Sequence, residues 1–256
     1  MREEALTGGN TTGAVLVGGV VHKPGSPWTA TVHAVLRHLE EAGFDGAPRA
    51  LGFDEQGREM LTYLPGETIG DRRPWPAWAS ADSMLVQVGR WLRRVHDLTA
   101  GFVAPPGEHW FIGGAMSPGL VVGHQDAAPW NAVVDGDRLV GFCDWDIAGP
   151  TAPEWDLAFS ALTWVPLASP GEGPPTDERR RRFHLFLDAY GYDGDRGAFA
   201  SVVPQRARRQ AAVIREMAGA GDPTSVALLP IAGVLEHAAT GVDALSADFW
   251  EPPARA

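Results

Sequence analysis

The sequence predicts an α+β protein with a small, β-rich N-terminal lobe and a larger, mainly helical C-terminal lobe. Residues 14–17 and 20–23 are short β-rich runs, and the glycine pair between them is typical of a hairpin turn. From about residue 80 onward, apolar residues recur instead at helical spacing. A proline and a glycine, beginning at Pro65, break the chain between these regions. We therefore divide the chain into lobes of residues 1–64 and 65–256.

One helix and two further strands complete the predicted N-terminal lobe. The helix covers residues 29–42 and ends at Gly43, because glycine is common directly after a helix. Its apolar stripe consists of Val32, Val35, Leu36 and Leu39. Strands are expected at 48–51 and 59–64, with a polar turn at 54–57 between them. With the hairpin, these runs predict a small antiparallel sheet.

The C-terminal lobe is predicted to combine several helices with three short strands. The expected helices cover residues 80–98, about 183–190, 204–219 and 224–245. The expected strands lie at 120–122, 132–134 and 139–142. Asp135 and Gly136 supply the turn between the last two strands, and residues 169–175 form a loop.

Composition excludes some classes of protein and leaves others open. The net charge of -11 disfavours binding to nucleic acid or to anionic membranes, which attract basic surfaces. A cationic substrate would suit this charge, although many soluble proteins are acidic without such a role. Cys143 is the only cysteine, so no internal disulfide can form, which fits a reducing cytoplasm. The start at Met1 does not resemble a secretory signal, and no apolar run approaches membrane-spanning length.

The most informative motif lies between His124 and Asn131, with a further aspartate at Asp144. The first run has the spacing H-x-D-x-x-x-x-N, in which Asp126 is the central acid. In a phosphoryl-transfer site, this spacing lets an aspartate meet the attacking hydroxyl while the asparagine reaches a metal ion. Asp144 follows a short apolar segment and is positioned to be the main metal ligand. Magnesium commonly stabilises the charge that a phosphoryl group carries in transfer.

The order of these segments resembles the aminoglycoside phosphotransferase family. The resemblance rests on the glycine turn, the strand with a basic residue, the segment 61–67, the motif and the run from Asp144 to Ala158. It covers residues of about 5 to 165. Protein kinases have Asp-Phe-Gly and an activation segment after the motif, which this chain lacks. The resemblance therefore implies a protein-kinase-like fold, with an N-terminal nucleotide-binding lobe and a C-terminal catalytic lobe that phosphorylates small molecules.

The resemblance also implies roles for individual side chains. Asp126 is the candidate catalytic base, with a turn or helix-cap aspartate as the alternative. Asn131 and Asp144 offer oxygen ligands to magnesium. The alternative is that Asn131 is a turn residue and Asp144 a strand-end residue without a metal role. Asp146 shares a face with Asp144 in an extended chain, so it is a candidate for contacting the metal site or the substrate. Glu154 is a candidate substrate residue.

Nucleotide binding is assigned to the N-terminal lobe, with ATP or GTP as the phosphoryl donor. Lys23 ends a strand and could reach the α- and β-phosphates, or it could simply be an exposed lysine. Gly9 and Gly13, with Gly8, would let backbone amide groups approach phosphates, although glycine-rich hairpins are common. Tyr63 and Leu64 lie in the expected hinge between the lobes, where backbone groups would meet the adenine base.

The helix glutamate that usually pairs with the lysine is absent in this sequence. The family places it four residues before the leucine that corresponds to Leu36, and Val32 stands there instead. Glu40 and Glu41 lie about two turns further along. The ion pair is therefore missing, rearranged or supplied from elsewhere. This departure favours, as the alternative function, a catalytically silent kinase-like module that binds a nucleotide or another ligand.

The acceptor is expected between the motif and the C-terminal helices, and its identity is open. The family phosphorylates cationic amino sugars but also neutral or singly charged hydroxyl compounds. Five carboxylates could meet a polycationic acceptor or could lie on solvated helix faces: Glu154, Asp188, Glu216, Glu236 and Asp243. A hydrolase is less favoured, because the sequence contains no serine nucleophile elbow. We expect a monomer or a homodimer.

Overall fold

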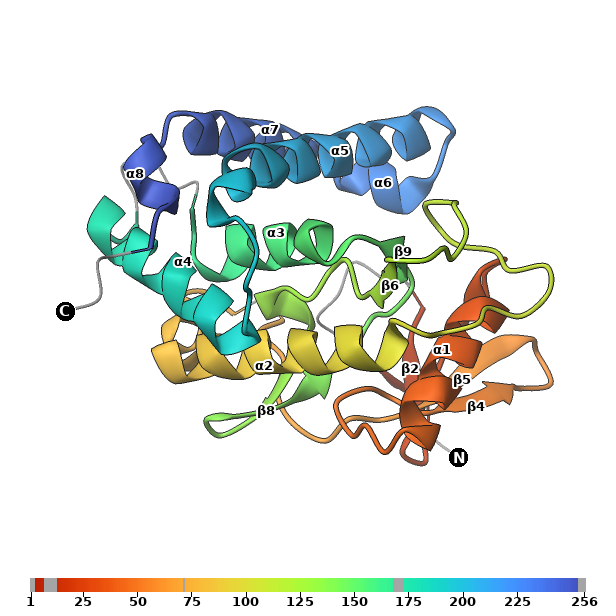
Figure 1. Cartoon of the computed structure of the whole chain (residues 1–256). Coiled ribbons are helices and arrows are strands. Elements are labelled where there is room, and N and C mark those ends of the chain that lie inside the picture. The colour runs from red at the N-terminus through yellow and green to blue at the C-terminus, as the bar shows by residue number, and fades with distance from the viewer. Residues whose placement is uncertain (1–2, 7–12, 71, 168–172, 253–256) are drawn as a thin grey trace.

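The computed structural model describes residues 3–6, 13–70, 72–167 and 173–252. Its described part has two lobes, with a five-stranded antiparallel sheet at one end and a mainly helical lobe that also contains four short strands (Figure 1). The α+β, kinase-like architecture predicted from the sequence is confirmed. No helix in the described part of the chain is long and apolar enough to cross a membrane.

The N-terminal sheet has the strand order β1-β2-β3-β5-β4, and all neighbouring strands are antiparallel. Its strands are β1 (Glu4–Ala5), β2 (Val15–Val17), β3 (Val20–Pro24), β4 (Ala50–Phe53) and β5 (Arg58–Thr62). Gly18 and Gly19 both have positive φ, as the predicted hairpin turn requires. The register sets Lys23 of β3 directly opposite Glu59 of β5. Directly opposed residues project their side chains from the same face of a sheet.

The helix that the structure describes in this lobe is α1 (Thr29–Glu41), as the apolar stripe predicts. Its buried face includes Val32, Val35, Leu36 and Leu39. After β5 the chain crosses to the second lobe through Gly66 and Glu67, and Glu67 exchanges two backbone hydrogen bonds with Val134. A Cβ atom at Gly66 would lie 2.8 Å from the carbonyl oxygen of Val134, so this close crossing requires glycine.

The C-terminal lobe is built from pairs of packed helices. They are α2 (Asp82–Thr99), α3 (Pro153–Trp164), α4 (Thr176–Tyr190), α5 (Phe199–Gly219), α6 (Pro223–Ala227), α7 (Leu229–Asp243) and α8 (Ala247–Trp250). Three 3-10 helices accompany them: η1 (Ala77–Ser80), η2 (Pro129–Asn131) and η3 (Arg196–Ala198). Helix α2 packs against α4, and α3 against α5; α5 and α7 lie side by side along the top of Figure 1.

Two small antiparallel sheets hold the motif within this lobe. Strand β6 (Val121–Gly123) pairs with β9 (Gly149–Thr151), and β7 (Ala132–Asp135) pairs with β8 (Arg138–Phe142). Three of these strands were expected from the sequence, whereas β9 and helix α3 were not. The prediction of one continuous helix over residues 224–245 is wrong. It is divided at Leu228, because Pro230 lies in the first turn of α7, where its missing N–H is tolerated.

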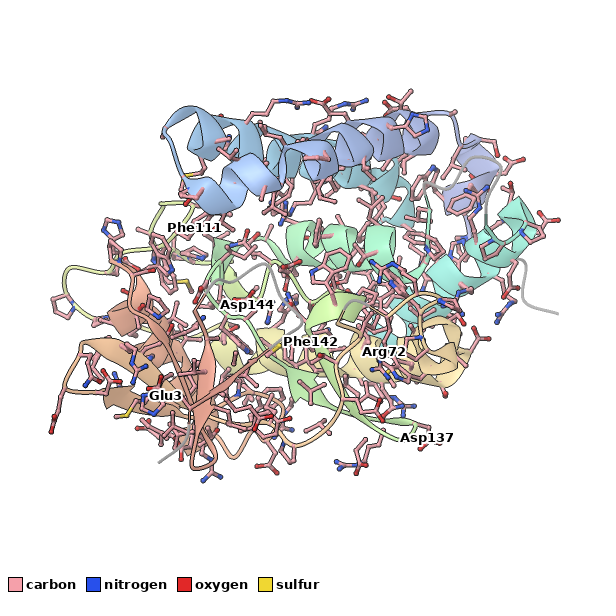
Figure 2. The ribbon with its side chains drawn as sticks, turned by 180° about the vertical axis from the view of Figure 1, so that it is seen from behind. Glu3, Arg72, Phe111, Asp137, Phe142 and Asp144 are labelled. Carbon is pink, nitrogen blue, oxygen red and sulfur yellow. The ribbon has the colours of Figure 1, made fainter. Side chains whose placement is uncertain are left out.

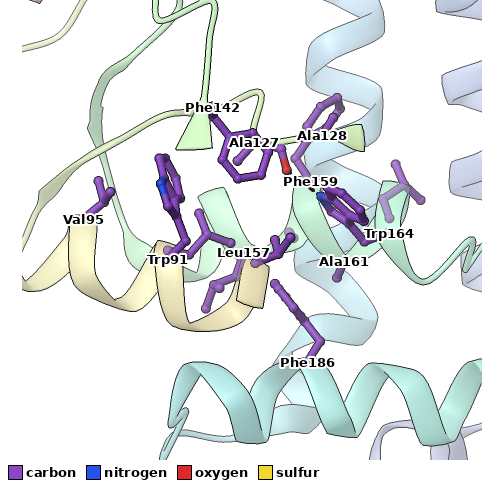
Figure 3. Close-up of a cluster of buried hydrophobic side chains, with 14 of the residues drawn as sticks. Trp91, Val95, Ala127, Ala128, Phe142, Leu157, Phe159, Ala161, Trp164 and Phe186 are labelled. Atoms are coloured by element: carbon purple, nitrogen blue, oxygen red, sulfur yellow. Dashed lines mark hydrogen bonds between the residues drawn. The ribbon is translucent and has the colours of Figure 1, made fainter. Parts of the chain in front are cut away.

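The hydrophobic core supports the segment that follows Asp126. Figure 3 shows Ala127 and Ala128 beside the rings of Phe142 and Trp164. Both alanines are fully buried, and the indole Nε1 of Trp164 donates a 2.8 Å hydrogen bond to the carbonyl oxygen of Ala127. Close-packed cores deform little, so this contact fixes the backbone next to the candidate base.

Candidate active site

Asp156 of helix α3 anchors the backbone of the catalytic loop, residues 123–131. The Asp156 carboxylate accepts hydrogen bonds from the backbone N–H groups of His124 at 3.1 Å and Gln125 at 2.7 Å. It also bonds the Nε2 atom of His96 at 2.9 Å. Burial alone would raise the pKa of Asp156, but these hydrogen bonds and the nearby histidines lower it. Asp156 therefore anchors the loop as a buried carboxylate.

His124 braces the loop from the inside. Its ring Nε2 donates to the carbonyl oxygen of Cys143 at 3.0 Å, while Nδ1 accepts from the backbone N–H of Asp126 at 3.2 Å. These two contacts require the neutral tautomer protonated at Nε2. Burial lowers the pKa of His124 to about 4, which keeps the ring neutral near pH 7. The ring thus connects the two segments that carry Asp126 and Asp144.

Two residues of the site adopt backbone conformations that favour glycine. Gln125 has φ 63° and Asp144 has φ 60°. Non-glycine residues with positive φ cluster at functional sites, where the surrounding structure compensates the strain. At Gln125, the guanidinium Nη2 of buried Arg206 donates a 2.8 Å hydrogen bond to the carbonyl oxygen. Arg206 comes from helix α5, so a distant element holds the strained loop.

Asp126 presents one carboxylate oxygen that no described donor reaches. The side-chain nitrogen of Asn131 donates to Oδ2 of Asp126 at 2.9 Å and to its backbone carbonyl at 3.0 Å. The Trp130 indole nitrogen lies 3.4 Å from the same Oδ2. The Oδ1 atom is buried and has no hydrogen-bond partner among the described residues. Burial, and then the charge of Asp144, raises the pKa of Asp126 to about 7, which suits a group that takes up a proton.

Lys23 meets three carboxylates where the N-terminal sheet faces the catalytic loop. Its Nζ atom lies 2.5 Å from Asp146, 3.3 Å from Glu59 and 3.7 Å from Asp144. Burial opposes the charge of this lysine, but the three carboxylates outweigh it and raise its pKa. Figure 2 shows Asp144 in the middle of the molecule, between the N-terminal strands and the helical lobe. Lys23 and Asp146 thus join the same centre as Asp144.

Glu59 supplies the carboxylate that the helix lacks at Val32. One oxygen of Glu59 faces Lys23, and the other lies 3.0 Å from Nε2 of His33 on helix α1. All three side chains are buried. Glu59 reaches Lys23 because the two residues are opposed across β3 and β5, whereas His33 ties the helix to the pair. Neither Glu59 nor His33 was expected from the sequence, because β3 pairs with β5 across the sheet and not with its neighbour along the chain.

The remaining nucleotide candidates lie at the edge of this centre. Tyr63 is exposed in the crossing segment, and its backbone N–H donates to the carbonyl oxygen of Gly19 at 3.4 Å. Leu64 follows it and is half-buried. Gly13 has φ 97°, which favours glycine, and lies in a turn before β2. Gly9, like Gly8, lies outside the described residues.

The residues present fit a magnesium ion that binds together with nucleotide phosphates. Asp144 offers a carboxylate, and the amide nitrogen of Asn131 is engaged by Asp126, which leaves its amide oxygen as the atom it can offer a metal. The described residues contain no group of three His, Cys, Asp or Glu side chains able to hold a metal without further ligands. Magnesium usually combines one or two protein carboxylates with substrate phosphates and water, so this small donor set is sufficient.

A cavity of about 290 Å³ adjoins the catalytic loop on the side of the C-terminal helices. Its walls include Gln125, Thr151, Trp155, Arg206, Arg209 and Gln210. Trp145 and Trp164 are buried in the core and do not line this cavity. None of the described residues that line this cavity is acidic.

The five carboxylates considered for a polycationic acceptor have other partners. Asp188 pairs with Arg196, Glu216 with Arg209, Glu236 with Arg215 and Asp243 with Arg208. Glu154 accepts a 3.3 Å hydrogen bond from the Tyr192 hydroxyl. The structure therefore does not bring these side chains together as a ring around the cavity.

Comparison with known proteins places the chain in a family. The sequence profile described as the phosphotransferase enzyme family matches residues 114–199, which include the whole motif. The trifolitoxin immunity protein of Rhizobium leguminosarum bv. trifolii is 38% identical over 209 residues, or 77% of each chain. The chain belongs to the phosphotransferase enzyme family. This confirms the resemblance to aminoglycoside phosphotransferases that the sequence showed.

Solved structures agree with the fold of this family member. A choline/ethanolamine kinase family protein from Mesorhizobium loti superposes with a TM-score of 0.61 at 16% identity, covering 95% of this chain and 92% of that protein. An amicoumacin kinase in complex with AMP-PNP and Ca2+ superposes with a TM-score of 0.64 at 10% identity, covering 93% and 89%. At such identities, the likeness concerns the fold.

Proposed function

We propose that the protein transfers the γ-phosphoryl group of ATP or GTP to a hydroxyl group of a small molecule. The observation that carries this proposal is the convergence of Asp126, Asn131 and Asp144 on one centre that also contains Lys23. Family membership supports the same reaction class. The names of the relatives, an immunity protein and kinases of small molecules, are consistent with it.

Asp126 acts as the base in this proposal. Its Oδ1, which no donor of the described residues reaches, accepts the hydrogen bond of the acceptor hydroxyl and orients the oxygen toward the γ-phosphorus. A bond forms between that oxygen and phosphorus, while the bond from phosphorus to the β–γ bridging oxygen breaks. The hydroxyl proton passes to Asp126, and the nucleoside diphosphate leaves. Proton transfer is late in such reactions, so orientation contributes most of the effect.

The other polar residues hold the donor side of the site. Lys23 directs its charge toward the phosphates while Glu59 fixes its position from the neighbouring strand. Asn131 and Asp144 would hold magnesium. Asp146, whose carboxylate contacts Lys23, would keep that lysine beside the ion. The bound ion would neutralise charge that develops on the phosphate oxygens. Asp156 and Arg206 act on the loop backbone rather than on the reacting atoms.

The silent-module alternative has weaker support. It rests on Val32, which stands in the place of the helix glutamate. The structure weakens this support, because Glu59 on the adjacent strand supplies a carboxylate to Lys23. The unpartnered Oδ1 atom and the raised pKa of Asp126 also favour an active base over a structural one.

Thermal unfolding with ATP or GTP, each with and without magnesium, tests the proposed donor site. A ligand at 100 times its dissociation constant stabilises a protein by about 2.7 kcal/mol, which a scan detects. We expect a magnesium-dependent rise in Tm with at least one nucleotide, and release of nucleoside diphosphate when an acceptor is added. Absence of a rise with either nucleotide would contradict the proposal.

A further inference from the structure

The cavity beside Gln125 has an electrostatic character opposite to that of the phosphoryl-transfer centre. Its polar side chains are two guanidinium groups, two carboxamides and one hydroxyl, and none of its described lining residues is acidic. The chain as a whole carries a net charge of -11, so this cationic lining is a local feature. A cavity without carboxylates offers no ion-pair partner to an amino sugar.

Arg206 forms a buried cationic wall of the cavity. It is 1% exposed, and its hydrogen bonds go to neutral acceptors: the Gln125 carbonyl oxygen at 2.8 Å and the Gln210 side chain at 2.9 Å. Among the described residues, its Nε atom has no hydrogen-bond partner, and its nearest counter-charges are Asp156 and Asp126, which attract it without forming an ion pair. Because neither carboxylate contacts the guanidinium directly, an anion in the cavity would add to this attraction.

Arg209 is the more accessible cation of the cavity. It lies one turn after Arg206 on α5, and its only described ion pair is with Glu216 at 3.1 Å. The side chain of Glu216 is 63% exposed, and exposed pairs contribute little because water screens them. A ligand anion in the cavity can therefore compete for the Arg209 guanidinium, which favours bidentate contact with carboxylates.

We propose that the phosphoryl acceptor is a small hydroxy acid that binds in this cavity with its carboxylate at Arg209. This inference rests on the proposed function, because it places the acceptor beside the Asp126 loop. Gln125 and Gln210 supply neutral polar contacts, and the Trp155 ring supplies an apolar wall. The volume of about 290 Å³ is at the lower end of ligand pockets, which suits a small acceptor.

The test compares matched acids and amines on the full chain with a nucleotide bound. The ligands are hydroxy acids, each paired with its neutral and amine counterparts, such as gluconate, glucose and glucosamine. Unfolding scans with magnesium and a non-hydrolysable ATP analogue report binding. Glucose 6-phosphate, an anion that carries no carboxylate, tests whether any anion suffices. We expect saturable stabilisation by at least one acid and none by its amine partner. Stabilisation by amines only, by phosphates only, or by no compound would overturn the proposal.

Arg209→Gln and Arg208→Gln form a matched pair for the same assay. Arg208 is the adjacent residue on α5, pairs with Asp243 and is not part of the cavity wall. We expect Arg209→Gln to weaken acid binding about tenfold, as loss of a charge-assisted hydrogen bond does. Arg208→Gln should bind the acid as tightly as the wild type. Equal effects of the two changes would overturn the assignment. Failure of nucleotide alone to stabilise any form would instead contradict the proposed function, so the two failures are distinguishable.

Discussion

The phosphoryl-transfer centre and the neighbouring cavity differ in the sign of their charges. In the centre, Asp126, Asp144 and Asp146 crowd together, and Lys23 compensates part of their charge. In the cavity, arginines of helix α5 line the wall without an acidic residue among the described lining. Converging carboxylates suit a metal ion and a proton, whereas guanidinium groups suit an anion. In our proposal, the donor and the acceptor of the phosphoryl group would therefore bind in surroundings of opposite charge, on either side of the loop that carries Gln125 and Asp126.

The largest effect is expected at Asp126. Asp126→Asn removes the proton acceptor but retains the size and hydrogen-bonding capacity of the side chain. Turnover should fall by roughly 10² to 10⁴-fold, the usual contribution of a positioned base, while nucleotide affinity changes little. Steady-state kinetics and nucleotide titration measure the two quantities. Turnover close to that of the wild type would remove Asp126 from the chemistry.

A smaller but still clear effect is expected from Arg206, which connects the two regions. Arg206→Met removes the hydrogen bond to the Gln125 carbonyl and leaves the strained loop less well fixed. We expect kcat to fall about tenfold while the KM for nucleotide is retained, because misplaced catalytic groups slow the chemical step. Arg215→Met, an exposed arginine on the same helix that pairs with Glu236, is the matched control. The same loss in both variants would indicate a general effect on stability.

Glu59→Gln tests whether the strand carboxylate positions Lys23. Without that charge, Lys23 is attracted only toward Asp146 and Asp144. The lysine would then occupy the carboxylates on the side of the proposed metal site and would be less well placed for the phosphates. We expect the KM for nucleotide to rise about fivefold to tenfold, with a smaller change in kcat. Glu40→Gln is the control, since Glu40 lies on α1 in an exposed pair with Arg49. Unchanged nucleotide kinetics in Glu59→Gln would contradict this positioning role.

A separate prediction concerns stability rather than activity, and depends on pH. Burial lowers the pKa of His124 to about 4, so between pH 6.5 and 4 the unfolded chain binds a proton at this ring that the folded chain does not. Stability must therefore fall as pH decreases through this window, by at most about 3 kcal/mol from this group. Denaturant unfolding of the wild type and His124→Asn at several pH values measures the difference. Parallel pH profiles would show that His124 does not contribute.

The sequence was most informative where the chemistry is local. The spacing from His124 to Asn131 and the position of Asp144 predicted a centre that the fold then assembles, because these residues lie on one loop and one hairpin. Arg206 could not be predicted this way, since it reaches the loop from 81 residues further along the chain. The same limit applies to Glu236 and Asp243 on α7, whose arginine partners on α5 depend on helix packing.

Glu59 and helix α3 show two further limits. Glu59 is opposite Lys23 only because β3 pairs with β5 rather than with its neighbour in sequence order, β4. Helix α3 is buried over most of its surface, so its apolar residues form a nearly continuous run without a polar face to define a period. In both cases, tertiary packing rather than local pattern determines the outcome.

The most direct test of the account is a calorimetric titration of a non-hydrolysable ATP or GTP analogue into wild-type protein and Asp144→Asn, each with and without magnesium. The account predicts that magnesium strengthens binding to the wild type and has little effect on the variant, because Asp144 would hold the ion beside the phosphates. Equal magnesium dependence in both proteins would remove Asp144 from the metal site and contradict the proposed centre.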